Sequence, residues 1–145
     1  MKERRGFSLI ELVVVMMVLG ILTAVAVPKL LGTSQNTVDG GLRQTLSVVR
    51  DAIELYAAEH NGKLPGQAQD AAAFHGEIEQ YLRSEFPACP VGPNTNADIT
   101  FDNTDPLAGL KASGNGWRYN FQTGEFICDN EDFSNGSPSV RYSEF

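Results

Sequence analysis

The chain has 145 residues, about the length of one domain, with 42% apolar residues and a formal net charge of −7. This charge argues against a nucleic-acid-binding surface, since 11 basic residues face 18 acidic ones and no basic cluster follows residue 5. Two cysteines and two histidines do not suit a zinc cluster of the usual kind, and the length excludes a multidomain enzyme. Of the apolar residues, 19 lie within residues 7–31, so the sequence predicts an apolar segment followed by a small polar domain.

The first predicted element is an apolar helix over residues 7–27, which contains a single charge, Glu11. As a helix it spans about 32 Å, enough to cross a bilayer core of about 30 Å. Three cations precede the segment and only Lys29 follows it closely, so the positive-inside rule places the N-terminus in the cytoplasm and exports the rest.

Three interpretations of this segment compete. The first is a secretory signal peptide cut near Ala24-Val25-Ala26, the second is a plain membrane anchor, and the third is a helix that is itself the functional part of the protein. Glu11 favours the third, because a carboxylate inside a membrane costs about 2.5–3.5 kcal/mol near the centre and marks a functional site. Cleavage after Gly6 would create an α-amino group on Phe7, and this cation could pair with the Glu11 of a neighbouring chain.

Residues 5–12, Arg-Gly-Phe-Ser-Leu-Ile-Glu-Leu, resemble the class III signal of type IV prepilins and type II secretion pseudopilins. The resemblance implies that residues 1–6 are a leader, that prepilin peptidase cuts between Gly6 and Phe7, and that Phe7 is then N-methylated. It also implies that Phe7 and Glu11 direct filament assembly. The expected partners are copies of the chain or related pseudopilins, prepilin peptidase, an inner-membrane assembly platform and, before assembly, membrane lipid.

A proline and a second helical pattern follow the apolar run. Pro28 lacks the N–H that would bond to Ala24, so we expect the helix to kink or break there. Apolar residues then recur at helical spacing from Val38 to Tyr56, and Asn61-Gly62 ends the pattern. The sequence therefore predicts residues 7–31 as a transmembrane and filament-core helix. The exported domain, 32–145, begins with the second half of the same long helix.

The remaining elements are short. A helix is predicted over Gln69–Phe86 with Asp70 as its N-cap, then a strand at 99–101 and a hairpin formed by 117–121 and 125–128. Trp117 and Tyr119 are expected to pack on the long helix. The prediction is an α+β, pilin-like fold in which the long helix packs on a small antiparallel β-sheet.

Two further features concern the exported domain. Cys89 and Cys128 are expected to form a disulfide in an oxidising compartment, closing a loop of about 40 residues and stabilising the fold by about 4 kcal/mol. The oxygen-rich stretch 129–135 lies where the resemblance implies calcium in major pseudopilins, but its spacing matches no EF-hand. We favour a solvated acidic loop and predict neither a metal nor another cofactor.

The predicted function is that of a structural subunit of a type II secretion pseudopilus, stored in the inner membrane with its domain in the periplasm and then assembled into a filament. The first alternative is a minor pilin of a type IV pilus. The second, from another class, is a small secreted binding domain. His60 and His75 belong to no recognisable triad or metal motif, so we expect no enzymatic activity.

Overall fold

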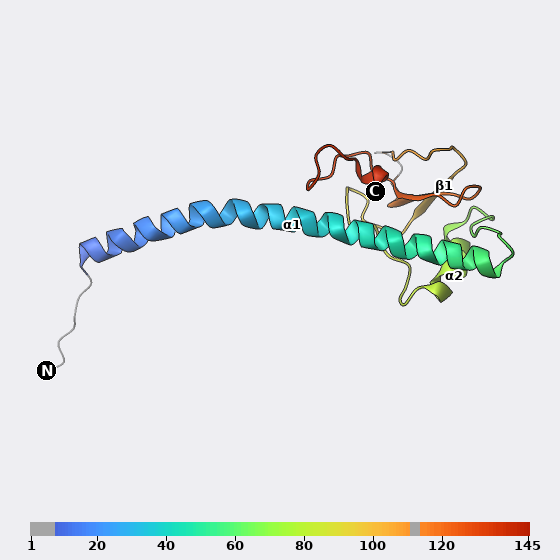
Figure 1. Ribbon diagram of the computed structural model, residues 1–145, viewed down its shortest axis with the longest axis horizontal. Helices are drawn as coiled ribbons and strands as arrows, with labels where there is room; N and C mark the ends of the chain where they lie inside the picture. The colour runs from blue at the N-terminus through green and yellow to red at the C-terminus, as the bar shows by residue number, and fades with distance from the viewer. Residues whose placement is uncertain (1–7, 111–113) are drawn as a thin grey trace. The chain divides into compact units, whose positions relative to one another are not determined.

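The structure is a computed structural model that describes residues 8–110 and 114–145. Its elements, in chain order, are α1 (Leu9–Glu59), α2 (Ala71–Ile78), the 3₁₀ helix η1 (Glu79–Tyr81), strands β1 (Ile99–Asp102), β2 (Trp117–Asn120) and β3 (Phe126–Cys128), and the 3₁₀ helix η2 (Tyr142–Glu144) (Figure 1). The chain divides into two compact units, one ending at Gln35 and the other covering Asn36–Phe145. The α+β fold class predicted from the sequence is confirmed.

The first unit contains the apolar half of α1. Its stretch Leu9–Lys29 is long and apolar enough to cross a membrane, and none of it is buried within the chain. The large apolar side chains there are between 47% and 79% exposed. Thr23 interrupts the apolar run, but its hydroxyl donates to the carbonyl of Leu19 at 2.7 Å, which satisfies it within the helix. The surface of this segment therefore suits lipid or other apolar helices.

Pro28 lies inside α1, and the helix continues through it without interruption. The helix break predicted at this residue is therefore not seen in this structure. Proline removes one hydrogen bond, and the intact bonds on either side are enough to keep the helical backbone. Loosening of the helix around Pro28 within an assembled filament stays a prediction.

The second unit has its core between α1, α2 and the sheet. Most of the predicted stripe on α1 is buried, since Leu42, Leu46, Val49 and Ile53 are all at most 2% exposed, whereas Val38 at its start is 40% exposed. Trp117 and Tyr119 are fully buried in the same cluster, which confirms their expected packing role. The predicted end of α1 is also confirmed, since the helix finishes at Glu59 and the chain turns through Asn61 and Gly62 with positive φ.

Helix α2 is shorter than predicted. Asp70 caps its start as expected, accepting a bond from the Ala73 N–H at 2.8 Å. Instead of continuing to Phe86, the helix tightens into η1 and Leu82 becomes extended. The reason is local: the residue before Pro87 avoids helical geometry, and Phe86 instead turns into the core beside Phe74, with ring centroids 5.8 Å apart.

The sheet has the order β1-β2-β3. The predicted hairpin is confirmed, because β2 and β3 are antiparallel and Trp117 is opposite Cys128. The prediction of an entirely antiparallel sheet was wrong, however, since β1 runs parallel to β2 with Ile99 opposite Trp117. A long connection leaves β1 at Asp102 and returns to the start of β2, which gives the crossover that parallel pairing needs.

Candidate assembly site

The start of α1 carries Glu11, the residue that sequence reasoning placed at the centre of assembly. Glu11 lies in the first turn, and its Oε2 accepts a hydrogen bond from the backbone N–H of Ser8 at 2.9 Å. Ser8 immediately precedes the helix, so the two residues occupy the first and last positions of a Ser-x-x-Glu capping box. The predicted cleavage pair Gly6 and Phe7 lies outside the described residues.

The Ser8–Glu11 contact was not predicted from the sequence, although the Ser-x-x-Glu spacing is a sequence signal for it. It has a physical consequence in lipid, where no water is present to bond the free N–H groups at a helix start. A carboxylate that accepts one of these N–H groups also meets the positive end of the helix dipole. Glu11 is therefore partly satisfied within its own chain.

The two cysteines lie together in the buried part of the second unit. Their sulfur atoms are 3.2 Å apart, but both are free thiols, so the predicted disulfide is not formed in this structure. The hydrogen bond from Cys128 lowers the pKa of the Cys89 thiol. The pKa of Cys128 is raised by its bond to Cys89 and by burial. The pair is thus close together but reduced.

The 129–135 loop is less solvated than expected. Asp129 is buried and forms an ion pair with Arg118 at 3.1 Å. Arg118 also donates to Asp102 at 2.6 Å, and we call these three residues the Arg118 cluster. The Asp129 carboxylate further accepts bonds from the Leu110 N–H and the Thr100 hydroxyl. This satisfied cluster ties the loop to β1 and β2, and it was missed because its members are far apart in sequence.

The pKa values near this cluster follow from its hydrogen bonds. The pKa of Asp102 is lowered from 3.8, chiefly by the backbone N–H of Thr104, while burial acts against this. The N–H of Asn103 and the guanidinium of Arg118 lower it further. Among the described residues, no group of three or more His, Cys, Asp or Glu side chains could hold a metal ion.

The two histidines have structural contacts. His60 stacks on Tyr56 with ring centroids 3.9 Å apart, and its Nδ1 lies 2.8 Å from the Tyr56 carbonyl. His75 stacks on Phe86 at 4.3 Å, and its Nε2 lies 3.1 Å from the carbonyl of Ala97. Both rings therefore act as packing surfaces at the positions where the structure holds them.

Comparison with known proteins shows which family the chain resembles. Residues 1–27 match the model of the prokaryotic N-terminal methylation motif. The chain is 32% identical over 90 residues to the ComG operon protein 3 homolog of Bacillus licheniformis, a match covering 62% of this chain and 86% of that protein. It is 39% identical over 62 residues to prepilin peptidase-dependent protein D of Escherichia coli, covering 43% and 42% of the two chains.

A third relative is the type II secretion system core protein G of Klebsiella pneumoniae, 30% identical over 74 residues, covering 51% of this chain and 52% of that one. The chain thus spans about half the length of the latter two relatives. No solved structure matches the chain closely enough to count as a relative.

An apolar helix that begins at a methylation motif, joined to a small α+β domain, defines a membrane-anchored prepilin. The chain belongs to the type IV pilin and pseudopilin family.

Proposed function

We propose that the mature chain is a structural subunit of a type II secretion pseudopilus, cut by prepilin peptidase between Gly6 and Phe7 and assembled through its N-terminal helix. One observation carries this proposal: none of the helix Leu9–Lys29 is buried by the residues that the structure describes, and a carboxylate, Glu11, caps its first turn. Lipid covers this surface before assembly, and the same helix of other copies covers it afterwards.

Glu11 gives the assembly its register. Before assembly the carboxylate bonds to the N–H of Ser8. In the filament it pairs with the α-amino group of Phe7 on a neighbouring copy, because two opposite charges in apolar surroundings are stable only together. The packing of His60 and His75 against aromatic rings supports a structural role over a catalytic one.

The test is expression of the full chain with prepilin peptidase and the assembly platform. We expect an intact mass that begins at methylated Phe7, and filaments that can be sheared from the cells. A mature protein that begins at Val27 would instead identify a secreted domain and overturn the proposal. Correctly processed protein that never forms filaments with any related pseudopilin would also contradict it.

A competence filament is the second candidate, favoured by the extent of the ComG matches. The chain covers 86% of the Bacillus licheniformis relative and 74% of competence protein ComGC of Halalkalibacterium halodurans, which is 30% identical. Deletion of the gene discriminates between the two, because loss of protein secretion supports the pseudopilus and loss of DNA uptake supports the competence filament.

Direct contact with DNA has little support in either case. Residues 36–145 contain 16 acidic and seven basic residues, a net side-chain charge of −9. Such a surface repels a polyanion, since binding to nucleic acid depends on lysine and arginine displacing counterions. In a competence filament, this chain would therefore be the scaffold and another component would hold DNA.

A further inference from the structure

The exposed side of α1 in the second unit forms a groove with the segment after α2. We call it the α1 groove; on the helix it is lined by Gly41, Thr45, Val48 and Leu55, whose spacing places them on one face. The segment 81–87 forms the opposite wall. Val48 is 47% exposed and Leu55 is 52% exposed.

The groove also carries charge. Asp51 on α1 and both Arg83 and Glu85 on the opposite wall contribute side chains to its lining. Arg83 is exposed and forms no ion pair with any residue that the structure describes. The groove therefore combines aliphatic side chains with one unpaired cation and two carboxylates.

A second feature of the same unit projects outward. Phe133 is 54% exposed, which is unusual for a large aromatic side chain, and the guanidinium of Arg141 lies 5.1 Å from the centre of its ring. Glu131 lies 3.7 Å from Arg141, and the two side chains are 40% and 42% exposed. We call Phe133, Arg141 and Glu131 the Phe133 knob.

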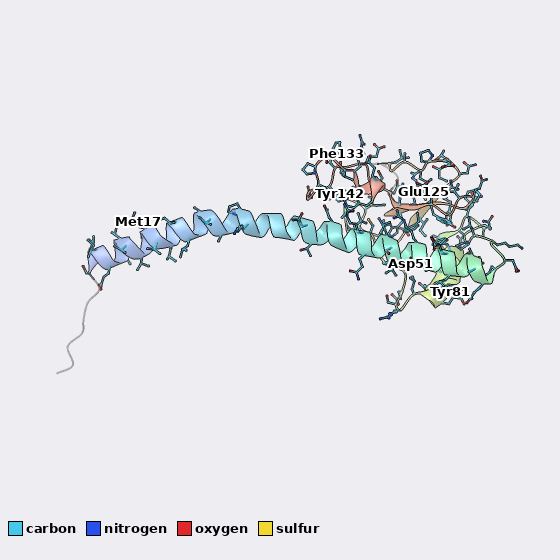
Figure 2. The ribbon with its side chains drawn as sticks, viewed as in Figure 1. Met17, Asp51, Tyr81, Glu125, Phe133 and Tyr142 are labelled. Carbon is cyan, nitrogen blue, oxygen red and sulfur yellow. The ribbon has the colours of Figure 1, made fainter. Side chains whose placement is uncertain are left out.

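The knob and the groove cannot meet within one copy. Figure 2 shows Phe133 on one side of α1, with Asp51 and Tyr81 on the other. Contact between two different surfaces of identical chains is heterologous, and it produces an open filament when the rotation does not close a ring. A two-fold dimer would instead bring identical surfaces together.

We propose that the Phe133 knob of one copy occupies the α1 groove of the next copy, with the aromatic ring against Val48 and Leu55. Each charge of the knob has an opposite charge in the groove: Glu131 would pair with Arg83, and Arg141 with Asp51. These two contacts would replace the exposed ion pair that Glu131 and Arg141 form within one copy. This inference rests on the proposed filament function and names the contact between neighbouring exported domains. Burial of the Phe133 ring removes apolar surface from water at each contact.

The experiment uses the full chain in cells that assemble it, with a photo-reactive benzoylphenylalanine in place of Phe133. Irradiation is expected to cross-link two copies, and mass spectrometry is expected to map the bond to Val48, Leu55 or the 81–87 segment. Filaments whose cross-links map elsewhere would overturn the contact and leave the filament function intact. A wild-type chain that forms no filaments would instead count against the proposed function.

Charge reversal gives a second measurement. Arg83→Glu is expected to reduce the cross-linked dimer about fivefold, since exposed ion pairs contribute up to about 1 kcal/mol. Adding Glu131→Arg to this variant should restore most of the cross-linked dimer. Lys63→Glu is the matched control, because it makes the same change of charge, from +1 to −1, at an exposed residue outside both surfaces. A double variant no better than Arg83→Glu alone, or an equal loss with Lys63→Glu, would refute the pairing.

Discussion

At the scale of single residues, Glu11 has two contacts that require different chemistry. Within the chain its carboxylate accepts a bond from the Ser8 N–H, and a neutral amide oxygen could do the same. Between chains the proposed partner is a cation, which requires the negative charge. A substitution that keeps the oxygen but removes the charge therefore separates capping from assembly.

We predict that Glu11→Gln and Glu11→Ala are both processed normally, and that both lose at least about tenfold in sheared filaments. An uncompensated buried charge costs about 3–5 kcal/mol, so the loss of its partner weakens every contact along the filament. Intact mass checks the processing and electron microscopy of sheared fractions checks the assembly. Normal filaments from Glu11→Gln would show that capping alone matters.

Asp102 gives a prediction about pH. Its pKa in the folded chain lies below the ordinary value of 3.8, so protonation favours the unfolded chain. Its contribution to the free energy of unfolding is therefore complete above about pH 4 and is lost as the pH falls through the folded value. Chemical unfolding of the detergent-solubilised chain can be followed by its single, fully buried Trp117.

Asp102→Asn is expected to lower the free energy of unfolding by about 1–2 kcal/mol at neutral pH, because Arg118 loses one of its charged partners. The same variant should flatten the decline in stability below about pH 4, where the contribution of Asp102 is lost. Asp98→Asn provides the control, since Asp98 is exposed and lies outside the Arg118 cluster. Identical pH profiles for Asp102→Asn and the parent would disprove the assignment.

At the scale of elements, sequence reasoning succeeds where one local pattern decides the structure. The stripe from Leu42 to Ile53 and the end of α1 at Asn61-Gly62 are visible in the sequence because spacing and turn residues determine them. The direction of β1 cannot be predicted in this way, because its parallel pairing with β2 depends on the path of a connection that has no regular sequence pattern. The Arg118 cluster is hidden for the same reason, because folding brings its members together from three separate segments.

The same element-scale packing brings Cys89 and Cys128 side by side. Residue Trp117 is opposite Cys128 in the sheet, and the Cys89 N–H bonds to the carbonyl of Asn96 at 2.9 Å, which fixes both ends of the pair. The sulfur atoms need to move from 3.2 Å to about 2.05 Å to form a bond. That approach is small, so we still expect oxidation in an exported compartment.

We predict that the exported chain carries a Cys89–Cys128 disulfide and that reduction lowers its free energy of unfolding by about 4 kcal/mol in the chain-entropy model. Denaturant curves with and without reductant measure this, and alkylation followed by intact mass counts the free thiols. The Cys89→Ser/Cys128→Ser variant should unfold like the reduced chain in both conditions. Two alkylated thiols in protein isolated without reductant would contradict the prediction.

At the scale of the whole molecule, the chain joins an apolar helix to a strongly acidic domain. Assembly through the helices concentrates copies of Asn36–Phe145, each with a net side-chain charge of −9. The gain from burying apolar helices is therefore opposed by repulsion between exported domains. Salt screens this repulsion, with a Debye length of about 30 Å at 0.01 M and about 10 Å at 0.1 M.

We predict that purified filaments dissociate at an ionic strength of about 0.01 M and are stabilised at about 0.15 M, as measured by the fraction that sediments. Sodium and potassium chloride should act equally, because screening depends on charge and concentration. The variant Glu54→Gln/Asp98→Asn removes two exposed carboxylates and should shift the transition to lower salt. If parent and variant sediment equally at every salt concentration, repulsion between the acidic domains does not limit assembly, and the apolar helices alone determine how stable the filament is.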